Sequence, residues 1–529
     1  MSAVSKVVEL ILTYPLQAVA LAAVFGIFFK ASKARIRRNP HGLPLPPGPK
    51  GWPIIGSLFD MPRDMPWVVY HDWFKVYGDM IYFEVLGQPF LILGSLERTS
   101  DLFDKKSSNY SDRLRMPMVL ELMHWHYNMA MLPYGTWWRR HRRSFNEYFH
   151  QNVVSKYQPV QSREVRAFLH RLLISPDKFM HHIRHTFAAT IMSVAYGISV
   201  RDSDDPYISR AEEALEGLAA AGIPGSFLVD IIPLLKHVPE WFPGAGFKRK
   251  AAHWRKLNHK VSELPFEYVE EQVKKGTAVS SVASALISRL PDENDPLYAE
   301  ERRIAQDTAA VAYVGGADTT VSSVQAFFLA MTLYPDVQKR AQAELDAIIG
   351  TDRLPDFSDR DALHYVNALV KETVRWNLVI PMAVGHMCSE DDEYNGFFIP
   401  KGTVVLGNGW SILHDSTVFS HPMEFRPEHY LKDGKLDPNA RDPDCAAFGY
   451  GRRKCPGRHM SDNSLYAIVS SVLAVYDIKP PVDEHGNVIK LKAEFTTGLL
   501  SYPVPFQCII KPRSALADSL IRDGVDVDH

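Results

Sequence analysis

The chain has 529 residues and a nearly balanced charge, with 59 lysine and arginine residues against 61 aspartate and glutamate residues. This balance excludes nucleic-acid binding by bulk electrostatics, which needs a strong excess of positive charge. The length allows about two to four domains or one large domain, and in either case a sizeable hydrophobic core.

The amino end predicts a membrane anchor. Residues 10–29 carry no charge and are mostly Leu, Ala, Val, Ile and Phe, and about 20 apolar residues suffice for a helix to cross the hydrocarbon layer. Five basic residues follow within 30–38, which favours a single-pass anchor on the endoplasmic reticulum with the rest of the chain cytosolic. A cleaved signal peptide is the alternative, but no small-residue cleavage pattern follows the apolar run.

Residues 39–60 are predicted to form a proline-rich linker between this anchor (1–38) and the folded body. Five prolines lie within 43–53, and proline favours extended backbone and cannot continue a helix. The simplest division of the remainder is one catalytic domain over 61–512 and a polar tail over 513–529.

The pattern along this domain predicts a mainly helical α+β fold with small β-sheets. Strands are expected at 81–85 and 90–93, and the Asn-Gly pair at 395–396 indicates a hairpin. The longest predicted helix runs over 301–334 and ends before Pro335. At 1.5 Å per residue it would span about 50 Å, which is enough to cross a large domain and organise its core.

The cysteines are expected to be reduced, because they show no CxxC spacing and the chain is not a small cysteine-rich one. They are Cys388, Cys445, Cys455 and Cys508.

Cys455 is the strongest candidate for a metal-binding side chain. It lies in FGYGRRKCPG (448–457), directly after Arg452, Arg453 and Lys454. Neighbouring positive charge lowers the pKa of a thiol, and the thiolate is the form that binds metals. The glycines of this loop permit backbone turns close to a flat ligand. The loop therefore suits an axial haem ligand, although a lone cysteine in a glycine-rich loop is more often structural.

The spacing of Phe448, Gly451, Arg453, Cys455 and Gly457 resembles the haem-binding signature F-x-x-G-x-R-x-C-x-G of the cytochrome P450 family. Three further motifs follow the order and spacing of that family: WWRRHRR (137–143), GGADTT (315–320) and ETVR (372–375). The resemblance implies the cytochrome P450 fold and haem b, with Cys455 as the axial thiolate. It also implies electrons from NADPH through a membrane-bound flavoprotein reductase, and insertion of one oxygen atom from O2 into a lipophilic small molecule.

GGADTT lies inside the predicted long helix. A glycine there costs about 1 kcal/mol relative to alanine, which a ligand beside the helix would justify. We expect Gly315 and Gly316 to let the helix approach a planar cofactor, and the Thr319 hydroxyl to bond back to a carbonyl and open a groove. In the resembled family the residues matching Asp318 and Thr319 deliver protons during oxygen activation. A simple packing notch is the alternative.

Trp138 and Arg142 stand four residues apart on one predicted helix face. By resemblance, an indole N–H and a guanidinium at these positions bind one haem propionate, and His386 contacts the second. The other basic residues of this motif form either a solvated face or a docking surface for an acidic reductase; they are Arg139, Arg140 and Arg143.

Glu372 and Arg375 stand one helical turn apart. By resemblance they form the family's buried E-x-x-R pair, which an arginine from a later segment completes. The matching segment here is FRPEHY (425–430), and it carries His429 at that position. Histidine can donate to Glu372 but lacks the bidentate fork of arginine. We expect the fold to survive this change, with a stability that depends more on pH.

The segments expected to line the substrate pocket are rich in apolar residues, which indicates an apolar ligand of roughly drug size. They are 114–129, the region around 218–227, 309–320, 379–384 and 497–500. The stretch 232–244, with Trp241 and Phe242, is either a membrane-dipping loop or an ordinary packed one.

The chain further resembles fungal microsomal members of the family that act in secondary metabolism on terpenoid, polyketide or indole skeletons, including tryptamine. Three alternatives stay open. One is a xenobiotic- or steroid-oxidising monooxygenase. The second is a haem-thiolate isomerase or dehydratase that works without a reductase and usually lacks the acid–alcohol pair. The third is a non-catalytic haem- or lipid-binding membrane protein.

Overall fold

The structure is a computed structural model that describes residues 38–202, 205–223 and 225–526. The predicted anchor at 10–29 lies outside these residues. Within them, no helix combines the length and the apolar character needed to cross a membrane.

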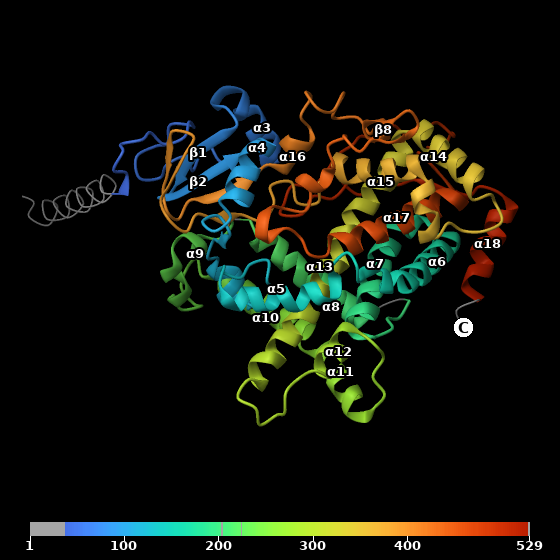
Figure 1. The fold of residues 1–529 in the computed structure, drawn as a ribbon, viewed down its shortest axis with the longest axis horizontal. Helices are drawn as coiled ribbons and strands as arrows, with labels where there is room; N and C mark the ends of the chain where they lie inside the picture. The colour runs from blue at the N-terminus through green and yellow to red at the C-terminus, as the bar shows by residue number, and fades with distance from the viewer. Residues whose placement is uncertain (1–37, 203–204, 224, 527–529) are drawn as a thin grey trace, which may run out of the picture.

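A large helical body and a smaller sheet region make up the molecule, with β1 and β2 at one end and α18 at the other (Figure 1). The mainly helical α+β class predicted from the sequence is confirmed. The helices are α3 (Pro66–Tyr77), α4 (Leu96–Thr99), α5 (Thr136–Phe149), α6 (Gln158–Ile174), α7 (Phe179–Tyr196), α8 (Pro206–Ala221), α9 (Leu228–Ile231), α10 (Gly246–Ser262), α11 (Leu264–Lys275), α12 (Val282–Ile287), α13 (Tyr298–Leu333), α14 (Pro335–Ile348), α15 (His364–Trp376), α16 (Gly409–Leu413), α17 (Arg458–Val475) and α18 (Ala515–Asp526).

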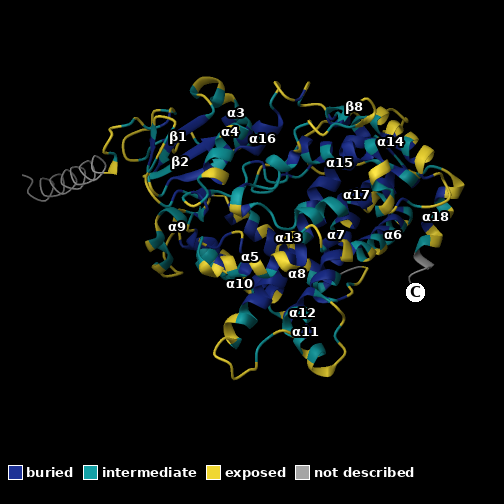
Figure 2. Cartoon of the chain, in the orientation of Figure 1, coloured by how far each residue is buried: buried dark blue, intermediate teal, exposed yellow. Residues whose placement is uncertain are grey.

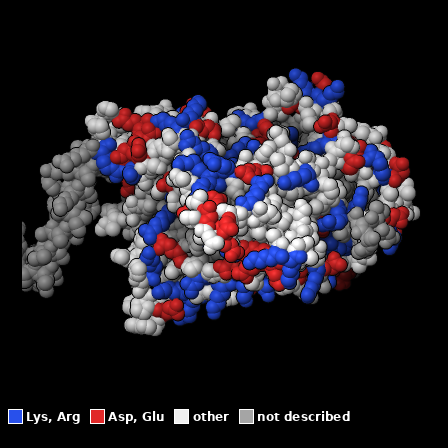
Figure 3. Space-filling model, turned by 60° about the horizontal axis from the view of Figure 1, so that its bottom comes forward, with Lys and Arg blue, Asp and Glu red and all other residues white. Residues whose placement is uncertain are grey.

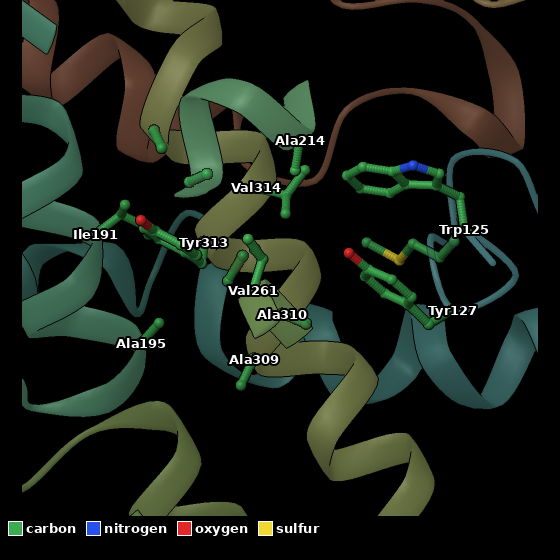
Figure 4. Close-up of a cluster of buried hydrophobic side chains, with 14 of the residues drawn as sticks. Trp125, Tyr127, Ile191, Ala195, Ala214, Val261, Ala309, Ala310, Tyr313 and Val314 are labelled. Carbon is green, nitrogen blue, oxygen red and sulfur yellow. The ribbon is translucent and has the colours of Figure 1, made fainter. Parts of the chain in front are cut away.

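The 36-residue helix α13 crosses the body and packs against α5, α7, α15 and α17. It begins three residues before the predicted start, and α14 begins at Pro335 as expected. Small residues at the contact, Ala309 and Ala310, let neighbouring helices approach closely. Figure 4 shows them beside Tyr313 and Val261, with Trp125 stacked on Tyr127 at a ring distance of 5.5 Å.

The main sheet has five strands in the order β1-β2-β7-β4-β3. Its predicted hairpin is confirmed, with Met80 opposite Leu93 and Val85 opposite Gln88. The hairpin at 395–396 is also confirmed and joins β5 to β6. The strands are β1 (Met80–Val85), β2 (Gln88–Leu93), β3 (Asp112–Arg113), β4 (His386–Met387), β5 (Asp392–Tyr394), β6 (Phe397–Ile399), β7 (Val404–Gly407), β8 (Leu431–Lys432), β9 (Lys435–Leu436), β10 (Tyr476–Lys479) and β11 (Ile509–Pro512).

The proline-rich segment over 39–60 is not a separate spacer. The Tyr82 N–H donates to the carbonyl of Pro47 at 2.8 Å, and the Ser57 N–H donates to that of Glu84 at 2.7 Å. Gly56 adopts a positive φ of 61° there, and a Cβ on it would lie 2.0 Å from the Glu84 carbonyl oxygen. The segment therefore lies along the edge of the sheet as part of the folded body.

The region over 513–529, expected to be a polar tail, contains α18. This helix packs against α6 and buries Ala517 and Ile521. Figure 2 shows buried residues concentrated along α13, α7 and α17, with exposed residues at the outer turns. Of these central helices, α13 and the first turns of α17 line the cavity described next.

Candidate active site

A cavity of about 590 Å³ lies between α13 and the loop that carries Cys455. Gly315 and Thr319 line it from α13, and Phe448 and Cys455 line it from the loop. The four other segments predicted from the sequence each contribute to its walls, through Asn128 and Met129, Leu218 and Ala219, Val379, Ile380, Ala383 and Val384, and Leu499 and Leu500.

The Cys455 loop is held by backbone contacts. The Cys455 N–H donates to the Phe448 carbonyl at 2.8 Å, and Gly457 caps the start of α17. Gly451 has a φ of 53°, and a Cβ on it would lie 2.0 Å from the Phe103 carbonyl oxygen, so only glycine fits there. The loop consequently presents the Cys455 sulfur to the cavity at the amino end of a helix, where the helix dipole favours an anion.

The charges around Cys455 differ from the sequence-based prediction. Arg452 bonds to the Tyr134 hydroxyl, Arg453 bonds to backbone carbonyls and Lys454 lies 3.5 Å from Asp444. Burial raises the pKa of the Cys455 thiol. The Gly457 N–H and the positive charges of Arg142 and Arg458 act in the opposite direction. The prediction that the three preceding cations make the thiol anionic is therefore wrong, because their side chains have other partners.

The basic side chains that line the same cavity include Arg113, Arg142, His386 and Arg453. Among the residues that the structure describes, none of the four forms an ion pair with a carboxylate within 4.0 Å. Burial lowers the pKa of all four, to about 10 for Arg453 and well below the usual range for Arg113 and His386. Uncompensated buried cations are costly, so this arrangement fits a ligand that supplies carboxylates.

The guanidiniums are oriented by backbone carbonyls. Arg453 donates to Ser111, Met129 and Leu132 at 2.7–3.2 Å, and Arg142 donates to Lys454 at 2.7 Å. Arg113, which the sequence did not single out, donates to three further carbonyls. The cluster is therefore held in place without any bound anion.

Trp138 and His386 differ from the predicted propionate contacts. The only N–H of the Trp138 indole donates to the Met129 carbonyl at 3.1 Å, and its ring stacks under Arg453 at 4.4 Å. Trp138 is thus a support for Arg453. His386 Nδ1 lies 2.6 Å from the Tyr110 carbonyl and donates to it, so the neutral ring offers only an acceptor at Nε2.

On α13 the predicted groove is present. The Thr319 hydroxyl donates to the Gly315 carbonyl at 2.7 Å. A Cβ on Gly315 would meet no atom within 4 Å, whereas a Cβ on Gly316 would lie 2.9 Å from Ile191 of α7. Gly315 therefore leaves room in the cavity, and the freedom at Gly316 serves helix packing instead.

Asp318 has two partners that the sequence did not indicate. Its carboxylate pairs with Arg184 of α7 and accepts a hydrogen bond from the Tyr502 hydroxyl at 2.5 Å. Arg184 is the one guanidinium in the largely apolar helix α7, which was a usable signal. Tyr502 lies 184 residues away in sequence and no local pattern indicates it.

The pair of Glu372 and Arg375 is fully buried, and the guanidinium makes two bonds to the carboxylate at 2.7 and 2.8 Å. His429 Nδ1 lies 3.2 Å from Glu372, and its Nε2 lies 2.7 Å from the Ser420 carbonyl. The histidine thus occupies the predicted third place. The pH dependence that we expect from it stays a prediction.

The basic face of α5 is mostly engaged within the molecule. Arg140 pairs with Glu300 and Glu301, and Arg139 stacks on Tyr134 at 5.7 Å. Arg143 is exposed. On the face that Figure 3 shows, positive and negative side chains are interspersed. Of the three residues considered for reductase docking, Arg139 and Arg143 are exposed and Arg140 is partly buried.

Comparison with known proteins gives one family. A family model described as Cytochrome P450 matches residues 46–509. The chain is 50% identical over 508 residues to cytochrome P450 monooxygenase COX2 of Coprinopsis cinerea, covering 96% of each chain. It is 41% identical to tryptamine 4-monooxygenase of Psilocybe cyanescens, covering 92% of this chain and 96% of that one. It is 40% identical to cytochrome P450 monooxygenase claR of Ampulloclitocybe clavipes, covering 92% of this chain and 89% of that one.

Proposed function

We propose a function from one premise: the chain belongs to the cytochrome P450 family of monooxygenases, which are oxidoreductases. It inserts one oxygen atom from O2 into a lipophilic small molecule of fungal secondary metabolism, with a terpenoid, polyketide or indole skeleton. The observation that carries this proposal is that Cys455 and the Thr319 groove line one cavity, with the unpaired basic cluster at the same cavity.

These residues fit haem b. Cys455 would ligate the iron, and Arg113, Arg142 and Arg453 would bind the two propionates. Gly315 leaves space for the ring beside α13. Bound haem supplies the activation of oxygen. The protein excludes water with its apolar walls, and the Thr319 hydroxyl and the Asp318 carboxylate would relay protons into the cavity.

Electrons would come from NADPH through a membrane-bound flavoprotein reductase. The predicted anchor supports a shared membrane surface, and so does the segment 232–244, where Leu234 and Trp241 are 78% and 80% exposed. Large exposed apolar side chains in one loop are typical of contact with a membrane.

A reductase-independent isomerase or dehydratase is the second candidate on the same fold. The placement of Asp318 and Thr319 in the cavity wall favours monooxygenation, as do the monooxygenase names of the relatives. Consumption of NADPH with reductase and a panel of lipophilic compounds separates the two, because an isomerase forms product without NADPH. A panel that includes steroids and drug-like aromatics tests the xenobiotic alternative in the same way.

The ligand assignment is tested by Cys455→Ala. We expect this variant to lose the thiolate-type spectrum of the reduced carbonyl complex, because no other cysteine of the described residues lines the cavity. Cys508→Ala is the matched control, since Cys508 is free but lies outside the cavity. An unchanged spectrum in Cys455→Ala would refute the assignment.

The proton-delivery role is tested by Thr319→Ala. Removing the hydroxyl should divert reducing equivalents from product to hydrogen peroxide, and Thr319→Ser should restore coupling because it keeps the hydroxyl. The measurement is the ratio of product and peroxide to NADPH consumed. If coupling stays the same in Thr319→Ala, the role assigned to Thr319 is wrong.

A further inference from the structure

Every carboxylate that lines the cavity is already paired with a basic side chain. Four aspartates line the cavity among the residues that the structure describes, and no glutamate does. Asp318 pairs with Arg184, Asp442 with Lys371, Asp444 with Arg458 at 3.4 Å and Asp462 with Arg360 at 2.8 Å. Within the described ranges, no lining carboxylate is left to neutralise a positively charged ligand.

The polar groups on the α13 side of the cavity are also largely engaged. The Thr319 hydroxyl donates to the Gly315 carbonyl, and the Thr190 hydroxyl donates to the Thr186 carbonyl at 2.7 Å. The remaining walls on this side are mostly aliphatic; they include Leu215, Leu218, Val311, Ala312, Ile380 and Leu500. An ion placed here would lose its hydration without gaining a counter-ion.

Positive charge is in excess on the other side. Arg113, Arg142 and Arg453 line the cavity without a carboxylate partner within 4.0 Å in the described part of the chain. They would repel an ammonium group. A substrate anion would have to compete for them with the two carboxylates of haem, which the proposed function places at this cluster.

We propose that the substrate of this enzyme is uncharged where it occupies the cavity, so that amines and carboxylic acids are rejected and neutral terpenoid, polyketide or indole skeletons are accepted. This rests on the proposed function, because it treats the cavity as the substrate site. It narrows that proposal, since indoles that carry an amine, such as tryptamine, are removed from the candidates.

The test uses the full-length haem-loaded protein and pairs of compounds that share a shape and differ in charge. One pair is 2-(indol-3-yl)ethyl-trimethylammonium and 3-(3,3-dimethylbutyl)indole. The quaternary nitrogen keeps its charge and cannot bind iron. A second pair is indole-3-butanoate and its primary amide, and a third pair repeats the first on a naphthalene ring. Binding is measured by equilibrium dialysis. We expect the neutral member of each pair to bind at least about 30-fold more tightly, because no counter-charge in the cavity offsets the cost of desolvating the ion.

The variant Arg184→Met tests whether the preference for uncharged compounds depends on the pairing of Asp318. Arg184→Met leaves Asp318 without its cation, so the preference for the neutral member of the trimethylammonium pairs should fall by at least about fivefold. Arg163→Met is the control, because Arg163 lies on α6 outside the cavity and pairs with Glu164. It should keep the original ratio.

Three results would overturn the proposal: equal binding within the pairs, an unchanged ratio in Arg184→Met, or failure of every neutral member to bind. The proposed function is tested by two separate measurements, the thiolate-type spectrum and the NADPH-dependent oxygenation of any panel compound. A protein with that spectrum and with equal binding of both members would keep the function and lose only the charge rule.

Discussion

Two buried clusters of charge in this molecule differ in whether their charges are balanced. In the first, Glu372 accepts two bonds from Arg375, one from the Arg426 N–H at 2.7 Å and one from His429. In the second, Arg113, Arg142 and Arg453 lie around the cavity, and no carboxylate in the described part of the chain pairs with them. Both clusters contain buried arginines, Arg375 in the first and Arg113 and Arg453 in the second.

This difference in charge balance distinguishes a cluster that stabilises the fold from a cluster that binds a ligand. A buried charge is tolerated when a counter-charge and hydrogen bonds satisfy it. The cluster around Glu372 has these within the chain, and its job is to hold α15 against the segment that follows α16. The cluster around Arg453 has only carbonyl oxygens, so it remains short of negative charge until a ligand supplies it. Missing counter-charge is thus a sign of a binding site.

The largest effect that would test this comparison is expected from Arg375→Met. It leaves Glu372 buried without its cation, which costs about 3–5 kcal/mol. We expect loss of folded protein, measured as yield and helical circular dichroism. Glu372→Leu combined with Arg375→Met should recover part of the loss, because it removes the orphaned charge. Arg522→Met, in an exposed pair with Asp518, is the control and should change nothing. A native unfolding midpoint in Arg375→Met would contradict this account.

An intermediate effect is expected from Arg142→Met in the other cluster. Here the removed charge has no carboxylate partner among the described residues, so the helical spectrum should be retained. The variant should lose haem faster, because one hydrogen bond from a charged donor to a carboxylate contributes about 1.5–3 kcal/mol. The expected increase in the rate of haem transfer to apomyoglobin, which is the measurement, is about 10–100-fold. Arg143→Met, on the exposed side of the same helix, should transfer haem at the original rate. If Arg142→Met unfolds the chain, the two clusters do not differ as described.

The smallest effect concerns His386. Burial, together with the charges of Arg113 and Arg453, lowers the pKa of His386 well below its usual 6.5. The unfolded chain therefore binds the proton more readily, so stability is present above about pH 6.5 and falls as the pH drops below it, by about 1.4 kcal/mol at about pH 5.5. In haem-free protein, His386→Asn should remove this loss, because asparagine keeps a donor for the Tyr110 carbonyl without titrating.

The measurement is urea unfolding at neutral pH and near pH 5.5. His253→Asn is the control, because His253 is exposed. Haem loading should shrink the acid effect in the original protein, since nearby carboxylates favour the charged imidazole. An acid loss of the same size in His386→Asn would assign it to other groups.

What the sequence could predict were features encoded within a few residues. The pair at 372 and 375, the bond from Thr319 to Gly315 and the first hairpin all follow from spacing along one helix or one turn. The start of α14 follows from Pro335. Each of these depends on local geometry, which the chain sets wherever the element lies.

What it could not predict depended on the direction of side chains and on partners from distant segments. Arg452, Arg453 and Lys454 adjoin Cys455 in sequence, yet their side chains bind the Tyr134 hydroxyl, backbone carbonyls and Asp444 instead. The single donor of Trp138 was already used by a carbonyl nine residues away. Arg184 and Tyr502 reach Asp318 only because α7 and the carboxyl-terminal loop both pack on α13.

The helix α18 lies beyond residue 509, where the match to the family ends. It covers α6 with Ala517 and Ile521, and the preceding Arg513 binds Asp346 of α14 at 2.9 Å. A protein truncated after residue 509 would expose the apolar surface of α6 that α18 covers, and it would lose the ion pair between Arg513 and Asp346. We expect the truncated protein to aggregate even though every residue around the cavity is intact. Recombinant protein should therefore include the residues through at least Asp526.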